Sequence, residues 1–572
     1  MQSITAQLES AFRQAISAAF GVEADPLITQ AVNDKFGDYQ SNVAMGLAKE
    51  LAGKTGQKGN PHAVAEQIKG KLDLSGMASE VWIAGPGFIN VRLSAGFLGR
   101  QLREIYNDER LGIEKTGRPV RTVIDYSGPN VAKEMHVGHI RSTLIGDALA
   151  RMIEFQGNQV VRQNHVGDWG TQFGMLLAYL RESSLGTDSH IGDLEEFYRS
   201  AKKRFDEDAA FADEARQRVV RLQAGSPQEL ALWSRIVEES RRHFLPLYER
   251  MGIKLTRDDE RGESFYNAFL ADVVGDLRKQ GVAEESQGAV VVWAGGFESP
   301  LIIQKTGGGF GYGTTDLAAI RFRVRELGAR RIVYVTDARQ IQHFRQVFAA
   351  ARKAGWAEGV ELDHVTFGSI MGEDGTPFKT RTGGVVKLKD LLDEAEERAF
   401  ALVTEKNPEL GEGQRREIAR AVGIGGIKYY DLARDRTGDY GFSWEKMLAM
   451  DGNTAPYLQY AYARIRSIFR KAGTEASEEA DIELGSPHEL GLAKHILQLG
   501  QVIEVVGREL KPHHLCTYLY DLATKFSGFY ENCPVLQSQE PTRSSRLGLC
   551  EVTARTMAVG LDLLGIEHPE QM

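Results

Sequence analysis

Between residues 121 and 367 the sequence alternates short β-branched runs with helical stretches, and this alternation constrains the fold most. The run RTVIDYS is followed by a loop, by the amphipathic stretch HIRSTLIGDALARMIEFQG and by a second run, QVVRQNHVG. This order has the length of one βαβ unit. Further strand-like runs, AVVVW, LIIQK, RIVYVTD and HVTFGSI, are separated by helical stretches such as 315–327 and 340–354. The alternation predicts a mainly parallel, doubly wound α/β sheet of the Rossmann-like type.

The rest of the chain divides around this alternating region. Residues 1–115 combine amphipathic segments with EVWIAGPGFINVRLS, which alternates as strand, turn and strand, so we expect a small N-terminal α/β domain. We expect the sheet domain over residues 116–385, with a highly charged helical insertion at about 183–262. Beyond residue 386 strand signals vanish, and apolar stripes flank Pro512: Ile496, Leu499, Ile503, Val506 and Leu510, then Leu515, Leu519, Leu522, Phe526 and Phe529. They predict an all-α helical bundle over residues 386–572.

Composition limits the classes of protein that this chain can belong to. Its 572 residues, 42% of them hydrophobic, suffice for several separate cores. No apolar run approaches the roughly 20 residues that cross a bilayer, and the N-terminus lacks a secretory signal pattern, so we expect a soluble cytoplasmic protein without a membrane partner. Three cysteines without CxxC spacing argue against a disulfide framework and a zinc site. The net charge of −9 provides no general attraction to DNA or RNA, so a nucleic acid would need a local basic face.

The loop after the first strand carries the most unusual cluster of side chains, NVAKEMHVGHIRST at residues 130–143. In a doubly wound sheet, ligands bind at the carboxyl ends of the strands, where such a loop meets a helix N-terminus that favours anions. His136 and His139 can donate hydrogen bonds to phosphate oxygens, and Gly138 lets a flat base approach the backbone. The loop therefore predicts a nucleotide site, although it contains neither GxGxxG nor a Walker-type loop. The alternative is a chance pair of exposed histidines at a helix start.

SGPNVAKEMHVGHIRST resembles the HIGH signature of class I aminoacyl-tRNA synthetases, and NVAK resembles the arginyl form of that signature. NHVGDWGTQFGMLLAYL at 164–180 is similar to a long block of the arginyl family, and PFKTRTGG at 377–384 stands where this family has its degenerate second signature. DGNTAPYLQYAYARIRSI and YLYDLATKFSGFYENCP look like a helical anticodon-binding domain, while FGDYQSN and GPGFIN resemble the family's extra N-terminal domain. The likeness covers essentially the whole chain and implies an arginyl-tRNA synthetase of the bacterial type.

This resemblance implies a two-step reaction with L-arginine, ATP and tRNA(Arg) as partners. Arginine attacks the α-phosphate of ATP, which carries Mg²⁺, and the arginyl group of the adenylate then passes to the 3′-terminal adenosine of the tRNA. The resemblance assigns ATP binding to His136, Gly138, His139 and, near the nucleotide, His343. The usual second signature, KMSKS, has a later lysine whose place here is taken by Thr380, and the resemblance implies that Lys133 substitutes for it. Lys379 and Arg381 remain as catalytic loop cations, unless they form only a solvated basic turn.

Specificity for arginine requires carboxylates, because a guanidinium is recognised best by an acidic partner in fork geometry. Three candidate arginine ligands match family positions: Asp125 at the end of the first strand, and Tyr312 with Asp316 in FGYGTTDLAAI. Tyr312 lies four residues before Asp316, so both side chains can face the same side of a helix start. For each aspartate the alternative is a helix cap or a loop carboxylate. Asn130 and Gln340 carry over as ligands of the substrate's amino and carboxylate groups.

The same resemblance places tRNA contacts at both ends of the chain. Phe88 and Asn90 match positions that contact the D-loop, where an aromatic ring can stack on a base. Phe88 can also be an ordinary core residue of a strand. The residues that correspond to anticodon contacts are Tyr457, Tyr460, Tyr530 and Met572. The chain ends PEQM where the family usually ends Glu-Arg-Met, so the terminal arginine is missing. We expect a monomer with no organic cofactor, no zinc and no DNA partner.

Three other classes of protein are compatible with parts of this pattern. A non-catalytic tRNA-binding paralogue would be expected to lack a histidine or a loop cation, yet His136, His139, Lys133 and Asp316 are all present. A class I synthetase for cysteine would need a zinc-binding cysteine set, and one for glutamate would line its pocket with cations. A small HxGH nucleotidyltransferase would not need the long helical C-terminal region.

Overall fold

The computed structural model describes residues 2–55, 59–183, 193–372, 375–376, 378, 386–473 and 481–572. Its centre is a four-stranded parallel sheet in the order β11-β10-β5-β6. The strands are β5 (Arg121–Asp125), β6 (Gln159–Gln163), β10 (Arg331–Asp337) and β11 (Glu361–Phe367). Helix α5 (Val137–Phe155) connects β5 to β6, and α13 (Ile341–Lys353) connects β10 to β11. The chain therefore winds in opposite directions from the adjacent strands β5 and β10, which confirms the doubly wound parallel sheet.

Two of the strand-like runs do not extend this sheet. The runs AVVVW and LIIQK form β8 (Ala289–Val292) and β9 (Leu301–Gln304), which pair with β7 (Ala283–Ser286) in a separate antiparallel sheet. Their expected place in the parallel sheet was wrong. The connection between β8 and β9 is too short for the crossover that parallel strands need, whereas antiparallel strands tolerate short connections. This small sheet packs with α11 (Leu270–Lys279) and α12 (Tyr312–Arg325).

Between β6 and this small sheet the chain is helical. Before α11, its α-helices are α6 (Gln172–Glu182), α7 (Leu194–Glu207), α8 (Ala209–Gln223), α9 (Pro227–Arg250) and the short α10 (Glu263–Tyr266). Helices α6 to α8 pack on one another around an apolar cluster that includes Phe173, Leu177 and Phe211. Acidic and basic side chains one helical turn apart pair on their outer faces, as Lys202 and Asp206 do on α7. The charged composition of this stretch is therefore that of solvated helix faces.

The N-terminal unit is a small α/β sandwich. Its antiparallel sheet, in the order β1-β2-β4-β3, contains β1 (Ile28–Gln30), β2 (Tyr39–Ser41), β3 (Ala78–Ala84) and β4 (Phe88–Leu93). Its helices are α1 (Ile4–Phe20), α2 (Val43–Thr55), α3 (Pro61–Lys69) and α4 (Ala95–Tyr106). The strand, turn and strand expected in EVWIAGPGFINVRLS are confirmed as β3 and β4.

The C-terminal region is a bundle of helices. It contains α14 (Leu388–Lys406), α15 (Glu412–Leu432), α16 (Trp444–Met447), α17 (Ala455–Ala472), α18 (Pro487–Ile496), α19 (Leu499–Glu509), α20 (His513–Asn532) and α21 (Thr542–Leu563). The stripe of α20, from Leu515 to Phe529, is buried as expected. The stripe before Pro512 is divided between the end of α18 and α19, because the helix breaks after Ile496. The expectation of no strand beyond residue 386 was wrong at β13 (Tyr440–Gly441), which pairs with β12 (Ile370–Met371).

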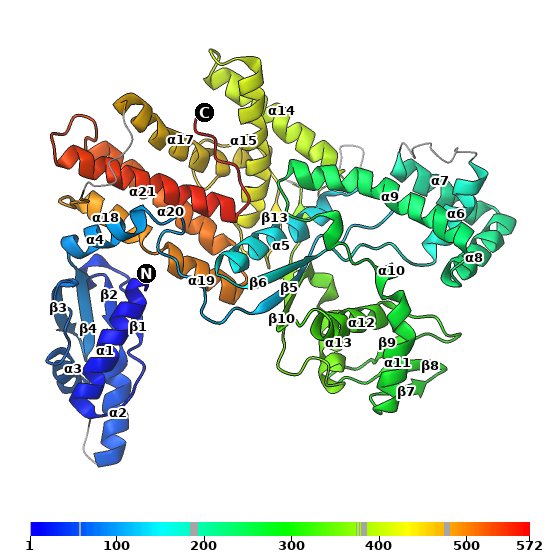
Figure 1. Ribbon diagram of the computed structural model, residues 1–572, viewed down its shortest axis with the longest axis horizontal. Coiled ribbons are helices and arrows are strands. Elements are labelled where there is room, and N and C mark those ends of the chain that lie inside the picture. Colours follow the sequence, from blue (N-terminus) through cyan, green and yellow to red (C-terminus); the bar gives the residue numbers. More distant parts are fainter. Residues whose placement is uncertain are drawn as a thin grey trace.

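The units meet along helices and a few polar contacts. Figure 1 shows the N-terminal unit in blue at the lower left, beneath α18, and α6 to α9 extending to the right. Helix α4 packs against α18 and α21, and the ammonium of Lys494 lies 2.5 Å from the carboxylate of Asp38. All three cysteines, Cys516, Cys533 and Cys550, are free thiols buried in the C-terminal helices. Among the described residues, no helix is long and apolar enough to cross a membrane.

Candidate active site

The candidate site lies at the switch point between β5 and β10. The loop after β5, residues 128–139, is called the histidine loop below. The carboxyl end of β10 lies beside that of β5, because Tyr334 pairs in register with Asp125. Segment 338–343, which follows β10, therefore opens on the same edge of the sheet as the histidine loop. Ligands of doubly wound sheets bind in this position.

The two histidines of the loop cap the helix that follows. His136 is the N-cap residue of α5, and its Nδ1 accepts a hydrogen bond from the Gly138 amide at 3.0 Å. His139 Nδ1 accepts one from the His136 amide at 3.2 Å, and the ring centroids lie 4.0 Å apart. A Cβ on residue 138 would lie 2.7 Å from the His136 ring, so Gly138 is required by the ring itself.

These contacts fix which nitrogen of each ring carries the proton. Burial, with a smaller effect of Lys133, lowers the pKa of His136, and burial followed by His136 lowers the pKa of His139 to about 3. Both rings are therefore neutral at pH 7. Because Nδ1 accepts in each ring, the proton lies on Nε2. The loop thus offers two Nε2–H donors, which is what phosphate oxygens require.

The backbone of the histidine loop is held in a strained conformation. Ser127, directly before the loop, and Ala132 within it have positive φ angles, 74° and 63°, in the left-handed region that residues with side chains rarely adopt. The amide of Ser127 donates to the Ser142 hydroxyl at 2.9 Å, and that of Ala132 donates to the Ser240 hydroxyl at 2.9 Å. Helices α5 and α9 therefore stabilise the loop from two sides.

The block NHVGDWG, which follows β6, links the histidine loop to α10. The amide of Val131 donates to Gly167 O at 3.1 Å, and the Glu263 amide donates to Val166 O at 3.1 Å. The carboxylate of Asp168 accepts hydrogen bonds from the Ser264 amide and hydroxyl, at 2.8 and 2.6 Å. These hydrogen bonds therefore position the start of α10 near the edge of the sheet where the histidines lie.

Asp316 and His343 form a pair beside this edge. His343 Nε2 lies 2.6 Å from Asp316 Oδ2, and the hydrogen bond and charge of Asp316 raise the pKa of His343 against the opposing effect of burial. Tyr312 begins α12, one turn before Asp316, and its side chain is exposed. Gln340 lies exposed just before α13. These four predicted residues come from α12 and from the segment that follows β10.

Sequence reasoning missed Glu263, the first residue of α10. Burial, followed by the charges of Asp168 and Asp316, raises the pKa of Glu263 to about 8. The charge of Glu263 in turn raises the pKa of Tyr312. Glu263 is therefore a second carboxyl group whose charge interacts with those of Asp316 and Tyr312. A glutamate in the first turn of a short helix is also an ordinary choice for helix stability, so the sequence carried no distinct signal.

Asp125, the other expected guanidinium ligand, already forms an ion pair with an arginine of the chain. Its Oδ2 lies 2.6 Å from Arg323 Nη2, and Arg323 also donates from Nε to Gln163 Oε1 at 2.6 Å. The Arg323 side chain is completely buried, under the carboxyl ends of β5 and β6. In this structure Asp125 therefore binds the guanidinium of an arginine from the chain itself.

Of the cations expected at the phosphates, the structure describes Lys133 alone. Lys133 is exposed, and its ammonium lies 4.7 Å from the ring centroid of Tyr198 on α7. Asn130 is exposed in the same loop. Lys379 and Arg381, the cations of the second signature, lie outside the described residues.

The residues expected to contact tRNA lie in the two terminal regions. Phe88 is half-buried at the start of β4, whereas Asn90 is fully buried and accepts a hydrogen bond from Gln40 at 2.8 Å. On α17, Tyr460 is exposed and Tyr457 packs against Tyr520. The guanidinium of Arg464 lies 4.5 Å from the ring centroid of Tyr530 on α20, and Met572 packs against α14 and α15.

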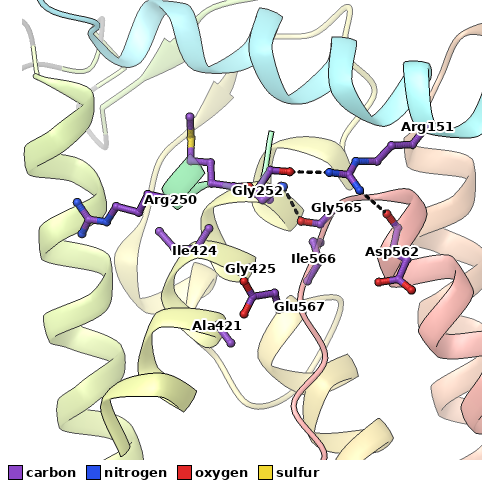
Figure 2. A pocket seen from close by; sticks show the side chains of 12 residues that line it. Arg151, Arg250, Gly252, Ala421, Ile424, Gly425, Asp562, Gly565, Ile566 and Glu567 are labelled. Atoms are coloured by element: carbon purple, nitrogen blue, oxygen red, sulfur yellow. Dashed lines mark hydrogen bonds between the residues drawn. The ribbon is translucent and has the colours of Figure 1, made fainter. Parts of the chain in front are cut away.

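A cavity of about 160 Å³ lies away from this edge, between α5, α15 and the segment that follows α21. Figure 2 shows Arg151 donating to the carbonyl oxygens of Gly252 and Asp562, at 2.5 and 3.3 Å. The buried ammonium of Lys428 donates to the carbonyl oxygens of Met251 and Gly565, and burial lowers its pKa to about 8. These cations hold the C-terminal segment against the sheet domain.

Comparison with known families covers most of the chain. Residues 101–444 match the family "tRNA synthetases class I (R), catalytic domain", residues 458–572 match the DALR anticodon binding domain, and residues 6–93 match the arginyl tRNA synthetase N terminal domain. The arginine–tRNA ligase of Cellvibrio japonicus is 53% identical, with 98% of each chain covered. That of Laribacter hongkongensis is 51% identical over the full length of both chains.

Solved structures agree in fold over the full chain. Arginyl-tRNA synthetase from Plasmodium falciparum superposes with a TM-score of 0.87 at 32% identity, and that from Thermus thermophilus with 0.83 at 27% identity; both cover 100% of each chain. The catalytic, N-terminal and anticodon-binding regions are all present in the order that the resemblance implied. The chain belongs to the class I arginyl-tRNA synthetase family.

Proposed function

We propose that this enzyme, an arginine–tRNA ligase, carries out both steps of its reaction at the switch point between β5 and β10. Mg-ATP and L-arginine form arginyl-adenylate and pyrophosphate, and the arginyl group then passes to the 3′-terminal adenosine of tRNA(Arg). The observation that carries the proposal is that groups suited to an anion and groups suited to a cation lie on the same edge of the sheet. Neutral histidines with free Nε2–H donors suit phosphate, and the carboxyl groups of Asp316 and Glu263 suit a guanidinium.

For the phosphates, we assign donor roles to His136 and His139 and a charge role to Lys133. In-line displacement at phosphorus needs little covalent help from the protein; it needs positioning and positive charge on the phosphate oxygens. The strained backbone of the histidine loop is consistent with this assignment, because it fixes the donors before the substrate arrives. We assign Lys379 and Arg381 as further cations for the leaving pyrophosphate, and His343 to the nucleotide side of the site.

For arginine, we assign the guanidinium to Asp316 and Glu263, with Tyr312 beside it. A guanidinium presents five donors in a planar fork, so two carboxyl groups and an aromatic ring can contact it together. Asn130 and Gln340 are assigned to the amino and carboxylate groups of the amino acid. His343 keeps the Asp316 carboxylate oriented through their hydrogen bond.

For the tRNA, we assign Phe88 and Asn90 to the D-loop and Tyr457, Tyr460, Tyr530 and Met572 to the anticodon. Arg464, Arg470 and Lys471 on α17 provide local positive charge for phosphates. Asn90 reaches an RNA base only through a rearrangement of its bond with Gln40. We further propose a cytoplasmic monomer whose domains divide at residues 115 and 385.

The test is exchange of pyrophosphate into ATP, run with each of the twenty amino acids, with and without bulk tRNA. We expect exchange with arginine only, and only when tRNA is present. Robust exchange with cysteine or glutamate would overturn the assignment of the amino acid. Exchange with arginine in the absence of tRNA would remove only the requirement for tRNA.

A further inference from the structure

Lys387 lies where three segments meet, next to the histidine loop. The amide of Val137 donates to Val386 O at 3.0 Å, and the amide of Leu388 donates to Met135 O at 2.8 Å. His136 and Lys387 therefore face each other across a short antiparallel bridge. The backbone of residue 387 is fixed against the residue that caps α5.

The side chain of Lys387 forms ion pairs with three carboxylates. Its ammonium lies 2.8 Å from Glu134 Oε2, in the histidine loop, and 3.8 Å from both Asp193 Oδ2 and Glu195 Oε2, at the start of α7. The hydrogen bond that Lys387 donates to Glu134, together with these charges, raises the pKa of Lys387, so the ammonium remains charged. One positive charge thus offsets part of the charge of three anions beside the proposed phosphate site.

Glu134 is also the chain neighbour of Lys133, the lysine proposed to contact the phosphates. Lys133 makes no hydrogen bond or ion pair within the described part of the chain; its ammonium lies over the Tyr198 ring at 4.7 Å. If the Glu134 carboxylate lost its partner, it would become available to pair with this neighbouring ammonium. Because Lys387 holds Glu134, the Lys133 ammonium stays available.

We propose that Lys387 is a positioning residue for ATP: it holds the Glu134 carboxylate away from Lys133 and joins α7 to the histidine loop. This inference rests on the proposed role of Lys133 at the phosphates. Without Lys387, Glu134 would pair with Lys133 and add uncompensated negative charge near the triphosphate. ATP binding would weaken, while the arginine ligands Asp316 and Glu263 would be unaffected.

The experiment compares Lys387→Met with Lys389→Met in pyrophosphate exchange at saturating tRNA. Lys389 is a matched control, because it lies two residues later and its ion pair is with Asp393 on the exposed face of α14, at 2.7 Å. We expect Lys387→Met to raise KM for ATP about tenfold with little change in KM for arginine. Lys387→Arg should restore most of the affinity, and Lys389→Met should resemble the unmodified enzyme.

A double variant separates this role from a purely structural one. Adding Glu134→Gln to Lys387→Met removes the competing carboxylate, so KM for ATP should return toward its original value. Glu134→Gln alone is measured to complete the cycle. An unchanged KM for ATP in Lys387→Met, or a raised one that Glu134→Gln fails to lower, would overturn the inference. Lys133→Ala tests the underlying assignment separately: if it leaves ATP kinetics unchanged, the role of Lys133 at the phosphates is wrong.

Discussion

If the proposed assignment holds, the carboxyl groups of Asp316 and Glu263 determine which amino acid this site accepts. Asp316→Asn preserves size and some hydrogen bonding but removes the charge that faces the guanidinium. Loss of a charged pair in a site that excludes water costs about 2–5 kcal/mol, so KM for arginine should rise by about two orders of magnitude. Citrulline, with a neutral urea, should lose less, so the preference for arginine over citrulline should narrow. Asp272→Asn, on an exposed face of α11, serves as the control. Unaltered arginine kinetics in Asp316→Asn would show that this residue is only a partner of His343.

Glu263 predicts that arginine binding releases a proton. Its pKa of about 8 means that the carboxyl group is mostly protonated at pH 7 when no cation is bound. A guanidinium favours the ionised form, so affinity for arginine should increase as pH rises from 6.5 to 8, by at most about tenfold per pH unit, and then level off. Titration calorimetry in buffers of different ionisation enthalpy would measure the proton released. Glu263→Gln should abolish this dependence, whereas a flat profile in the unmodified enzyme would refute the prediction. Asp168, Asp316 and Tyr312, whose charges interact with that of Glu263, and His343, the partner of Asp316, are unchanged in this comparison.

Single residues also show where sequence reasoning reached its limit. The spacing of Tyr312 and Asp316 was enough to place both on one helix start. The partner of Asp125 was not predictable, because Arg323 is 198 residues away and an isolated arginine in a helix carries no sign of its partner. The protonated nitrogens of His136 and His139 likewise depend on backbone amides that only the folded loop positions.

Helices and strands were easier to predict where a short period repeats, as in the βαβ unit from β5 to β6 and in the stripe of α20. The direction of strand pairing was harder to predict, because β8 and β9 have the same composition as strands of a parallel sheet. The break between α18 and α19 was missed for a similar reason: the apolar residues on both sides of it keep a helical spacing. A periodic pattern records which face is buried and does not record where the helix axis changes direction.

At the scale of elements, α5 is joined to α15 by a buried ion pair. Arg141 Nε lies 2.9 Å from Asp431 Oδ2, with both side chains almost completely buried, and Tyr440 OH donates to the same oxygen at 2.9 Å. Removing one partner leaves a buried charge, so Asp431→Ala should reduce the local stability of α5 and α15 by about 3–5 kcal/mol. Tyr440→Phe should cost about 1 kcal/mol. Hydrogen exchange of the amides in both helices would measure these losses.

A double variant checks that the loss comes from the unpaired charge. Arg141→Met combined with Asp431→Leu removes both charges, so its loss should be smaller than that of Asp431→Ala. If the double variant loses as much as the two single changes together, packing rather than charge explains the effect.

At the scale of the whole molecule, the N-terminal unit is positioned by its contact with the C-terminal helices. The pair of Lys494 and Asp38 is partly buried, and Asp38 also accepts a hydrogen bond from the Leu93 amide at 2.8 Å. We expect Lys494→Ala to loosen this contact and raise KM for tRNA several-fold in aminoacylation, since a partly buried pair contributes about 1 kcal/mol. KM for ATP should not change. Reversing both charges, with Asp38→Lys and Lys494→Asp, should recover part of the loss; no recovery would mean that the pair does not position the unit.

The buried thiols of the C-terminal helices have a practical consequence. Burial raises the pKa of Cys516 and Cys550, and thiol reagents attack the thiolate, so labelling in the native state must wait until α20 or α21 opens. The labelling rate then measures how often these helices open, and no engineered probe is needed. Because Cys516 and Cys533 lie at the two ends of α20 while Cys550 lies within α21, mass spectrometry can time the two helices separately. Bound tRNA(Arg) should slow thiol labelling in whichever of the two helices it keeps from opening.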